Sequence, residues 1–236
     1  MLLPKRAMLL LRYIGDSADS MDFTAFLAGG TVRDLLLGVK NLDLDIVVEG
    51  EAIKLGEKLS QELNAALVVH KSFGTCTLVT KDNLKIDLAT ARKETYKRPA
   101  AFPTVEFSSL KDDLARRDFT INAMAISLNK ENFGQLIDFF GGARDLSRGV
   151  IRVMHDGSFI DDPTRIFRAV RFERRFGFSI DARTLMLIKA AIRKKMLEKV
   201  SKGRIQKEMI LINKEKNRVK MLDRLREFPL WHYSAL

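Results

Sequence analysis

The chain has 236 residues, 46% of them hydrophobic, with a formal net charge of +11 and an isoelectric point near 9.8. That length fits one large domain or two small ones, and the single cysteine, Cys76, excludes an internal disulfide and fits a reducing, cytoplasmic compartment. The sequence contains no run of about 18 apolar residues, so no membrane-spanning helix is expected. The positive charge favours a polyanionic partner such as nucleic acid.

The first predicted elements lead to a glycine-rich turn. Residues 5–18 have the spacing of a moderately amphipathic helix, and residues 23–28 are short and apolar, like a buried strand. Gly29 and Gly30 follow at once, and helical spacing resumes over residues 31–38. Such a turn leaves a loop of backbone N–H groups free to bind an anion.

Two aspartates open the next apolar run. Asp43 and Asp45 flank Leu44, and residues two apart on a strand point to the same face. Two adjacent carboxylates repel each other unless a cation lies between them or they share a proton. With free N–H groups nearby, these hard oxygen ligands suit Mg²⁺ carrying a nucleoside triphosphate. The alternative, a solvated strand edge, does not explain why the glycine pair and the aspartate pair occur together.

The apolar pattern after the aspartate pair predicts one helix and more strands. Residues 51–64 have helical periodicity. Three strand-like runs follow, separated by turn residues: 66–70, 75–80 and 84–91. Asp87 lies in the last run between two apolar residues, and a charge there is costly unless it faces a site. Asp87 is therefore either a functional carboxylate or a structural residue held in a salt bridge.

The middle of the chain combines a predicted loop with a short helix. Residues 92–109 contain two prolines and mixed charge, which predicts a mobile loop. Ser108 or Ser109 can cap the helix that follows, because acidic residues occupy its first turn.

A polar segment comes directly after this helix. Arg116, Arg117 and Asp118 are consecutive, and Asn122 lies just beyond them. Arginines bind triphosphate oxygens in a bidentate manner, and an aspartate can accept hydrogen bonds from ribose hydroxyls. Alone, such a triplet is usually a surface charge run.

Residues 136–154 predict a glycine turn, a short helix and a strand that closes the first domain. We assign Asp138, Arg144 and Asp145 in this segment mainly to structural roles, with a place near the site as the alternative for Asp138.

The next segment predicts the start of a helix with two recognition residues. Asp162 and Arg165 are three apart and should share a helix face, with Pro163 in the first turn. One interpretation is a capping aspartate and an ion pair. The other is base recognition, because cytosine and adenine each present an amino donor beside an unprotonated ring nitrogen. An aspartate acceptor beside an arginine donor complements those two bases and repels uracil and guanine.

Beyond Asp181 the chain is helical and basic. Arg168 and Arg171 extend the face of the recognition helix and are candidates for phosphate contacts. The run Arg193-Lys194-Lys195 is either a solvated face or a contact to an RNA backbone.

These motifs in combination resemble the nucleotidyltransferase superfamily of DNA polymerase β, and within it the branch of bacterial CCA-adding enzymes and poly(A) polymerases. The resemblance rests on GG-x-VRD with LDLDIVV, on RRDFTINAMA, on QLIDFFGGARDLSRGVIRVM and on SKGRIQKE. It also rests on DDPTR, where the family has EDxxR, so that Asp161 replaces a glutamate.

The resemblance implies an α+β fold, with a mixed-sheet catalytic head over residues 1–150 and an all-helical neck over residues 151–236. It implies that Asp43 and Asp45 hold two Mg²⁺ ions and that Asp87 is a third catalytic carboxylate. Asp118 would read the ribose, and Asp162 with Arg165 the base. The full set of implied nucleotide-binding residues is Gly29, Gly30, Arg33, Arg117, Asp118, Asn122, Asp162, Arg165, Arg168 and Arg171.

The implied reaction transfers a nucleotide from ATP or CTP to the 3′ end of an RNA. Addition of CCA, CC or A to tRNA is the first alternative, and poly(A) synthesis is the second. A non-catalytic nucleotide- or RNA-binding module is the third, against which the aspartate pair argues. Family members usually continue into helical domains that grip tRNA, so a minimal enzyme and a piece of a longer protein both remain open.

Overall fold

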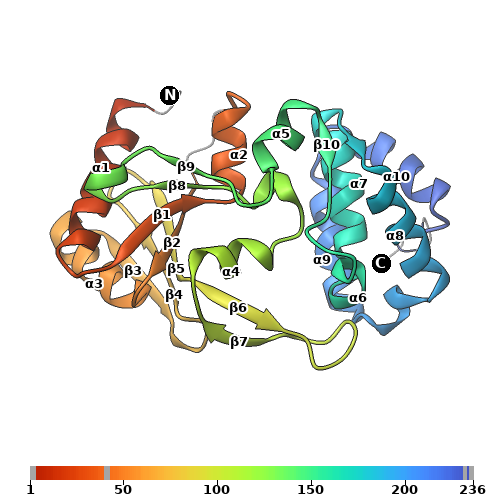
Figure 1. The fold of residues 1–236 in the computed structure, drawn as a ribbon, viewed down its shortest axis with the longest axis horizontal. Coiled ribbons are helices and arrows are strands. Elements are labelled where there is room, and N and C mark those ends of the chain that lie inside the picture. Colours follow the sequence, from red (N-terminus) through yellow and green to blue (C-terminus); the bar gives the residue numbers. More distant parts are fainter. Residues whose placement is uncertain (1–3, 40–42, 231–232, 234–236) are drawn as a thin grey trace. The chain divides into compact units, whose positions relative to one another are not determined.

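The computed structural model describes residues 4–39, 43–230 and 233, and its chain divides into two compact units (Figure 1). The first unit comprises Met1–Glu94, Val105–Arg117 and Ile121–Ala143. The second unit comprises Thr95–Thr104, Asp118–Thr120 and Arg144–Leu236. Two short segments from the middle of the chain, Thr95–Thr104 and Asp118–Thr120, therefore belong to the second unit. No local sequence pattern predicts this assignment.

A seven-stranded mixed sheet organises the first unit, in the order β3-β4-β5-β2-β1-β8-β9. Its strands are β1 (Thr24–Ala28), β2 (Leu44–Glu49), β3 (Ala66–His70), β4 (Thr75–Val79), β5 (Lys85–Thr90), β8 (Ala125–Ser127) and β9 (Leu136–Ile137). Strands β2 and β5 are parallel, and the other pairs are antiparallel. The predicted α+β class with a mixed sheet is confirmed.

Helices α1 (Lys5–Asp19) and α3 (Ala52–Leu63) pack against this sheet. In α1 the buried positions Leu11, Ile14 and Ala18 recur every three or four residues, so one apolar stripe faces the strands. Gly56 of α3 allows a close approach, because a Cβ there would lie 2.3 Å from the Cys76 Sγ of β4. The predicted helices at both positions are thus confirmed to within about two residues.

The predicted loop over residues 92–109 is wrong at both ends. Strands β6 (Arg92–Thr95) and β7 (Thr104–Phe107) pair as a separate two-stranded sheet. An ion pair of 2.9 Å joins Lys93 on one strand to Glu106 on the other. Both prolines lie between the strands, where they interrupt no ladder hydrogen bond.

Short helices connect the strands. They are α2 (Gly30–Leu36), α4 (Leu110–Ala115) and α5 (Gly142–Ser147). Ser109 is the N-cap of α4, because its hydroxyl accepts a hydrogen bond from the Asp112 N–H at 3.3 Å. Glu49 at the end of β2 accepts from the Leu110 N–H at 2.6 Å, which fixes the start of α4 beside the sheet.

The second unit is almost entirely helical. Its helices are α6 (Ser158–Asp161), α7 (Arg165–Phe176), α8 (Ala182–Arg193), α9 (Lys202–Asn213) and α10 (Arg218–Glu227). The predicted strand after residue 149 does not close the first sheet. Instead β10 (Val150–Ile151) pairs in parallel with β11 (Ser179–Ile180), a two-residue strand too short to have a periodicity of its own. No helix in the described part of the chain has the length and apolar composition needed to cross a membrane.

Candidate active site

Two predicted carboxylates lie next to each other on the sheet of the first unit. The register of β2 and β5 places Asp45 directly opposite Asp87, so both side chains point to the same face. Burial raises the pKa of Asp45, the charge of Arg117 opposes that shift, and the carboxylates of Asp87 and Asp43 raise it further. Thr31 donates its hydroxyl to the Asp43 carbonyl oxygen at 2.7 Å and, at 3.4 Å, to Asp45 Oδ2.

Asp87 satisfies both interpretations left open by the sequence. Its carboxylate accepts from the Thr77 hydroxyl at 2.5 Å and pairs with the Lys85 ammonium at 2.5 Å. These partners are what a structural salt bridge requires. Its place opposite Asp45 is what a third catalytic carboxylate requires, and that role stays a prediction.

The donor chemistry of these carboxylates fits Mg²⁺. Asp45 experiences two further negative charges in a partly buried position, a repulsion that a divalent cation relieves. Among the described residues, no group of three or more acidic, histidine or cysteine side chains forms a cage for a metal. Mg²⁺ is usually held by one or two carboxylates together with water and substrate phosphates, so an incomplete protein cage is the expected arrangement.

The glycine turn brings Arg117 close to Asp45. Gly29 has φ +73°, a conformation that favours glycine, and a Cβ there would lie 2.1 Å from Arg117 Nη1. The Arg117 guanidinium donates to Asp113 Oδ2 at 3.1 Å and to the Asn122 carbonyl oxygen at 3.4 Å. Asp113 is fully buried, so it holds Arg117 over the turn. The structure therefore brings Arg117 to Gly29, and the charge of Arg117 acts on the Asp45 carboxylate. Their nucleotide-binding and metal-binding roles stay predictions.

We expect Gly29→Ala to destabilise the chain by about 1–3 kcal/mol and to weaken ATP binding, because the methyl group strains the backbone and displaces Arg117. Thermal unfolding and ATP titration measure both effects. Gly203→Ala is the matched control, since Gly203 lies in α9 with nothing within 4 Å of an added Cβ. The control should leave ATP binding unchanged, and a Gly29→Ala chain that behaves like it would contradict the placement of Arg117.

Arg33 is buried rather than presented to solvent. Its Nε and Nη2 donate to Asp34 Oδ1 at 2.9 and 2.7 Å, and its Nη1 donates to Asn122 Oδ1 at 2.5 Å. These bonds join α2 to the segment that follows β7 and α4, and they bring two predicted nucleotide-binding residues into direct contact. A direct phosphate contact by Arg33 stays a prediction.

In the second unit, predicted phosphate ligands are neutralised by acidic partners. Arg168 donates from Nε to Asp118 Oδ2 at 2.7 Å, and Asp118 Oδ1 accepts from the Phe119 N–H at 2.8 Å. Arg171 is buried, with guanidinium nitrogens 3.8 Å from Glu208 and 3.7 Å from Glu215. Burial lowers the pKa of Arg171 and raises that of Glu208, as expected for charges removed from water.

The predicted shared helix face of Asp162 and Arg165 is wrong. Asp162 has extended backbone angles after α6, and α7 begins only at Arg165. The physical reason is Pro163, because the residue before a proline is disfavoured in the helical region. Arg165 is buried and donates from Nη1 to the Ser158 hydroxyl at 2.7 Å.

Asp162 nevertheless has a defined orientation. Its Oδ1 accepts from the Thr164 N–H at 3.0 Å and from the Thr164 hydroxyl at 2.6 Å, and it pairs with Arg204 Nη2 at 2.8 Å. Within the described residues, the hydrogen bonds and the ion pair of the Asp162 side chain all fall on Oδ1, and none falls on Oδ2. One oxygen of the carboxylate is thus fully used, and the other keeps its capacity to accept from a ligand. Sequence reasoning missed Arg204, which lies far along the chain within SKGRIQKE.

The structural assignments at the end of the first unit agree with the contacts. Asp138 accepts from the Gly142 N–H at 2.8 Å and from the Ala143 N–H at 3.0 Å, which caps the start of α5. In the second unit, Asp145 accepts from the Thr120 hydroxyl at 2.8 Å and from Arg152 Nε at 2.9 Å.

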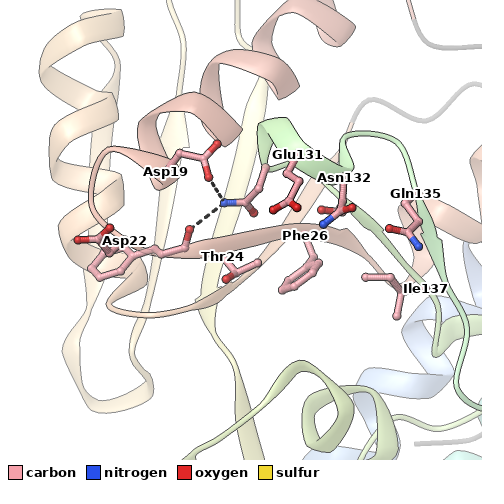
Figure 2. A pocket seen from close by; sticks show the side chains of 11 residues that line it. Asp19, Asp22, Thr24, Phe26, Glu131, Asn132, Gln135 and Ile137 are labelled. Atoms are coloured by element: carbon pink, nitrogen blue, oxygen red, sulfur yellow. Dashed lines mark hydrogen bonds between the residues drawn. The ribbon is translucent and has the colours of Figure 1, made fainter.

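A cavity of about 510 Å³ lies elsewhere in the first unit (Figure 2). Asp19, Thr24, Phe26 and Glu131 are among its lining residues. Its wall is fixed by Asn129, whose amide donates to Asp19 Oδ1 at 2.7 Å and to the Phe23 carbonyl oxygen at 2.9 Å. None of the predicted site residues lines this cavity, so it is distinct from the carboxylate cluster.

The sequence profile of the "Poly A polymerase head domain" family matches residues 25–152, which include the whole carboxylate cluster. The chain belongs to this family. A second profile, "Probable RNA and SrmB- binding site of polymerase A", matches residues 177–234 of the chain.

Proteins with similar sequences include tRNA nucleotidyltransferases. An A-adding tRNA nucleotidyltransferase of Geobacter sulfurreducens is 47% identical, over 94% of this chain and 25% of the relative. Another, from Halalkalibacterium halodurans, is 43% identical over 94% of this chain and 52% of the relative. A solved structure of the Thermotoga maritima CCA-adding enzyme complexed with tRNA has a TM-score of 0.86 and 47% identity, over 97% of this chain and 52% of that chain. This chain therefore spans about a quarter to a half of the length of these relatives.

Proposed function

We propose that the chain is the catalytic part of a template-independent RNA nucleotidyltransferase that adds A or C to the 3′ end of tRNA. The observation that carries the proposal is the pairing of Asp45 with Asp87 beside the glycine turn that Arg117 covers. Relatives with tRNA nucleotidyltransferase names support the same activity. The presence of tRNA in the Thermotoga maritima structure supports tRNA as the partner. We place the reaction in the cytoplasm.

In the proposed reaction the RNA 3′-hydroxyl attacks the α-phosphate of ATP or CTP, the bond between the α- and β-phosphates breaks, and pyrophosphate leaves. Asp43 and Asp45 would hold two Mg²⁺ ions, with Asp87 beside them. Bound there, the ions would activate the hydroxyl and stabilise charge on the leaving phosphates. Arg117 and the N–H groups of the turn at Gly29 and Gly30 would bind the triphosphate.

Residues of the second unit would identify the nucleotide. Asp118 would accept from the ribose, although Arg168 already occupies its Oδ2. Asp162 Oδ2 would accept from the amino group of adenine or cytosine. Arg165 would donate to the adjacent ring nitrogen or carbonyl. The geometry that favours this role is the use of Asp162 Oδ1 by Thr164 and Arg204, which leaves Oδ2 for the base.

Addition of a single A is the first candidate among the tRNA reactions. Both curated relatives described above carry the name A-adding. Addition of C, or of the whole CCA, is the second candidate, favoured by the name of the Thermotoga maritima structure.

Two tRNA substrates and two nucleotides separate these reactions. One tRNA ends before its CCA and the other ends in CC, and each is incubated with ATP or CTP alone in the presence of Mg²⁺. We expect one A on the tRNA that ends in CC and no extension of the shorter tRNA by CTP. Extension by C would select the second candidate. Long A tails would indicate a poly(A) polymerase, and no extension of either RNA would contradict the proposal.

A further inference from the structure

Arg204 of α9 joins segments that are far apart in the sequence. Its Nη2 lies 2.8 Å from Asp162 Oδ1, and its Nη1 donates to the Ala100 carbonyl oxygen at 2.9 Å. Its guanidinium carbon also lies 5.4 Å from the centre of the Phe102 ring. The Arg204 side chain is only 20% exposed, so a single partly buried guanidinium makes all these contacts within the second unit.

The contact with Asp162 restricts rotation of the carboxylate. Two hydrogen bonds and one ion pair converge on Oδ1: the bonds from the Thr164 N–H and the Thr164 hydroxyl, and the ion pair with Arg204 Nη2. Thr164 is two residues from Asp162, so its bonds form a local turn, whereas Arg204 approaches from another helix. A planar guanidinium is stiff and strongly charged, so it fixes the acceptor geometry better than a neutral local donor.

The contact with Ala100 fixes the tip between β6 and β7. Ala100 is buried, has φ +59°, and donates its N–H to the Ile160 carbonyl oxygen at 3.0 Å. Its carbonyl oxygen is the group that Arg204 binds. Phe102 on the same tip is 80% exposed. The Arg204 guanidinium therefore couples the position of this tip to the carboxylate of Asp162.

We propose that Arg204 is a positioning residue for base selection. It fixes the Asp162 carboxylate with only Oδ2 directed to a nucleobase, and it ties residues 95–104 to that orientation. Without Arg204 the carboxylate rotates, and the second unit discriminates less between bases that offer an amino donor and bases that do not. This inference rests on the proposed function, in which Asp162 reads the base.

The test measures the affinity of the whole chain for ATP, CTP, GTP and UTP in the presence of Mg²⁺, which requires no RNA. Arg204→Ala is compared with Arg224→Ala. Arg224 is a matched control because its side chain is 18% exposed, pairs with Glu173 at 2.9 Å and lies 4.7 Å from the Phe228 ring centre. Both variants remove ion pairing and a ring contact within the second unit, since Arg224 also pairs with Glu227, but only Arg204 contacts Asp162.

We expect both variants to melt at lower temperature, and only Arg204→Ala to reduce the ratio of ATP to GTP affinity, by on the order of tenfold. An Arg204→Ala chain that keeps the wild-type ratio would overturn the inference. If that variant does not fold, Arg204→Gln decides in its place, because glutamine keeps a donor nitrogen on a shorter side chain but loses the charge that pairs with Asp162. A reduced ratio in Arg204→Gln supports the inference, and an unchanged ratio overturns it.

Base reading by Asp162 and positioning by Arg204 are contradicted by different results. If wild-type protein and the Arg224→Ala variant bind all four nucleotides equally, base reading by Asp162 fails and this inference falls with it. If both discriminate and the Arg204 variants discriminate equally well, only the positioning role fails.

Discussion

Replacing Asp45 by asparagine should lower nucleotide incorporation by on the order of 10²–10³-fold while the chain stays folded. Asparagine keeps the shape of the side chain but removes the charge that would hold Mg²⁺. Burial raises the pKa of Asp45, with added repulsion from Asp87 and Asp43, so ionising this carboxylate costs more in the folded chain than in the unfolded chain. The melting temperature of the variant should therefore be unchanged or slightly higher.

Incorporation rates and thermal unfolding on the same preparation test this expectation. Asp82→Asn is the control, because the Asp82 side chain is 38% exposed. Among the described residues it pairs with Arg6 at the surface and accepts a hydrogen bond from the Thr80 hydroxyl. Asp43→Asn should behave like Asp45→Asn. Asp87→Asn should cost less, unless Asp87 is a third ligand. Rates near wild type in either Asp43→Asn or Asp45→Asn would refute the metal assignment.

Removing the side chain of Asp162 should relax the choice of base. In Asp162→Ala the amino group of A or C loses its acceptor, a cost on the order of 1–3 kcal/mol of discrimination, or roughly ten- to a hundredfold. Rejection of UTP and GTP should weaken more than transfer itself slows. The measurement is the incorporation rate with each of the four nucleotides, together with the melting temperature.

A purely structural Asp162 gives a different pattern. Loss of its bonds to Thr164 and Arg204 would lower the melting temperature but leave the nucleotide ratios intact. Asp223→Ala serves as the control, because Asp223 is an exposed aspartate on α10 paired with Arg226. Unchanged ratios in Asp162→Ala would remove the base-reading role without affecting the assignment of Asp45.

Local patterns in the sequence predicted the elements that carry the carboxylates. Apolar and polar residues alternate around Asp45 and Asp87, and apolar residues recur with helical spacing over α1 and α3. Both patterns involve residues only two to four positions apart, so they can be read directly from the sequence. The sequence predicts either Ser108 or Ser109 as the N-cap of α4, because both are serines directly before the helix and either hydroxyl can accept the capping hydrogen bond. Strands β6 and β7 were missed because the prolines and charges between them dominate the composition of the whole segment.

Contacts between distant residues were not accessible in this way. Arg168 and Asp118 are 50 residues apart, and their motifs predict a separate ligand group for each, a phosphate and a ribose, without indicating that the two side chains pair. Arg204 and Ala100 are 104 residues apart, and neither belongs to a motif of titratable residues that points to the other. The pattern around Pro163 predicts Asp162 and Arg165 on one helix face, whereas the proline disfavours helical angles at Asp162 and α7 begins only at Arg165.

Labelled ATP shows whether this chain transfers a nucleotide to RNA. ATP carrying the label on its α-phosphate, and ATP labelled on its γ-phosphate, are each incubated with Mg²⁺ and a high concentration of tRNA ending in CC at low salt. We expect the α-label to enter the RNA at its 3′ end and the γ-label to appear in pyrophosphate, and we expect Asp45→Asn to lower both by on the order of 10²–10³-fold. Transfer of the γ-label to the RNA, or a rate unaffected by Asp45→Asn, would contradict this expectation.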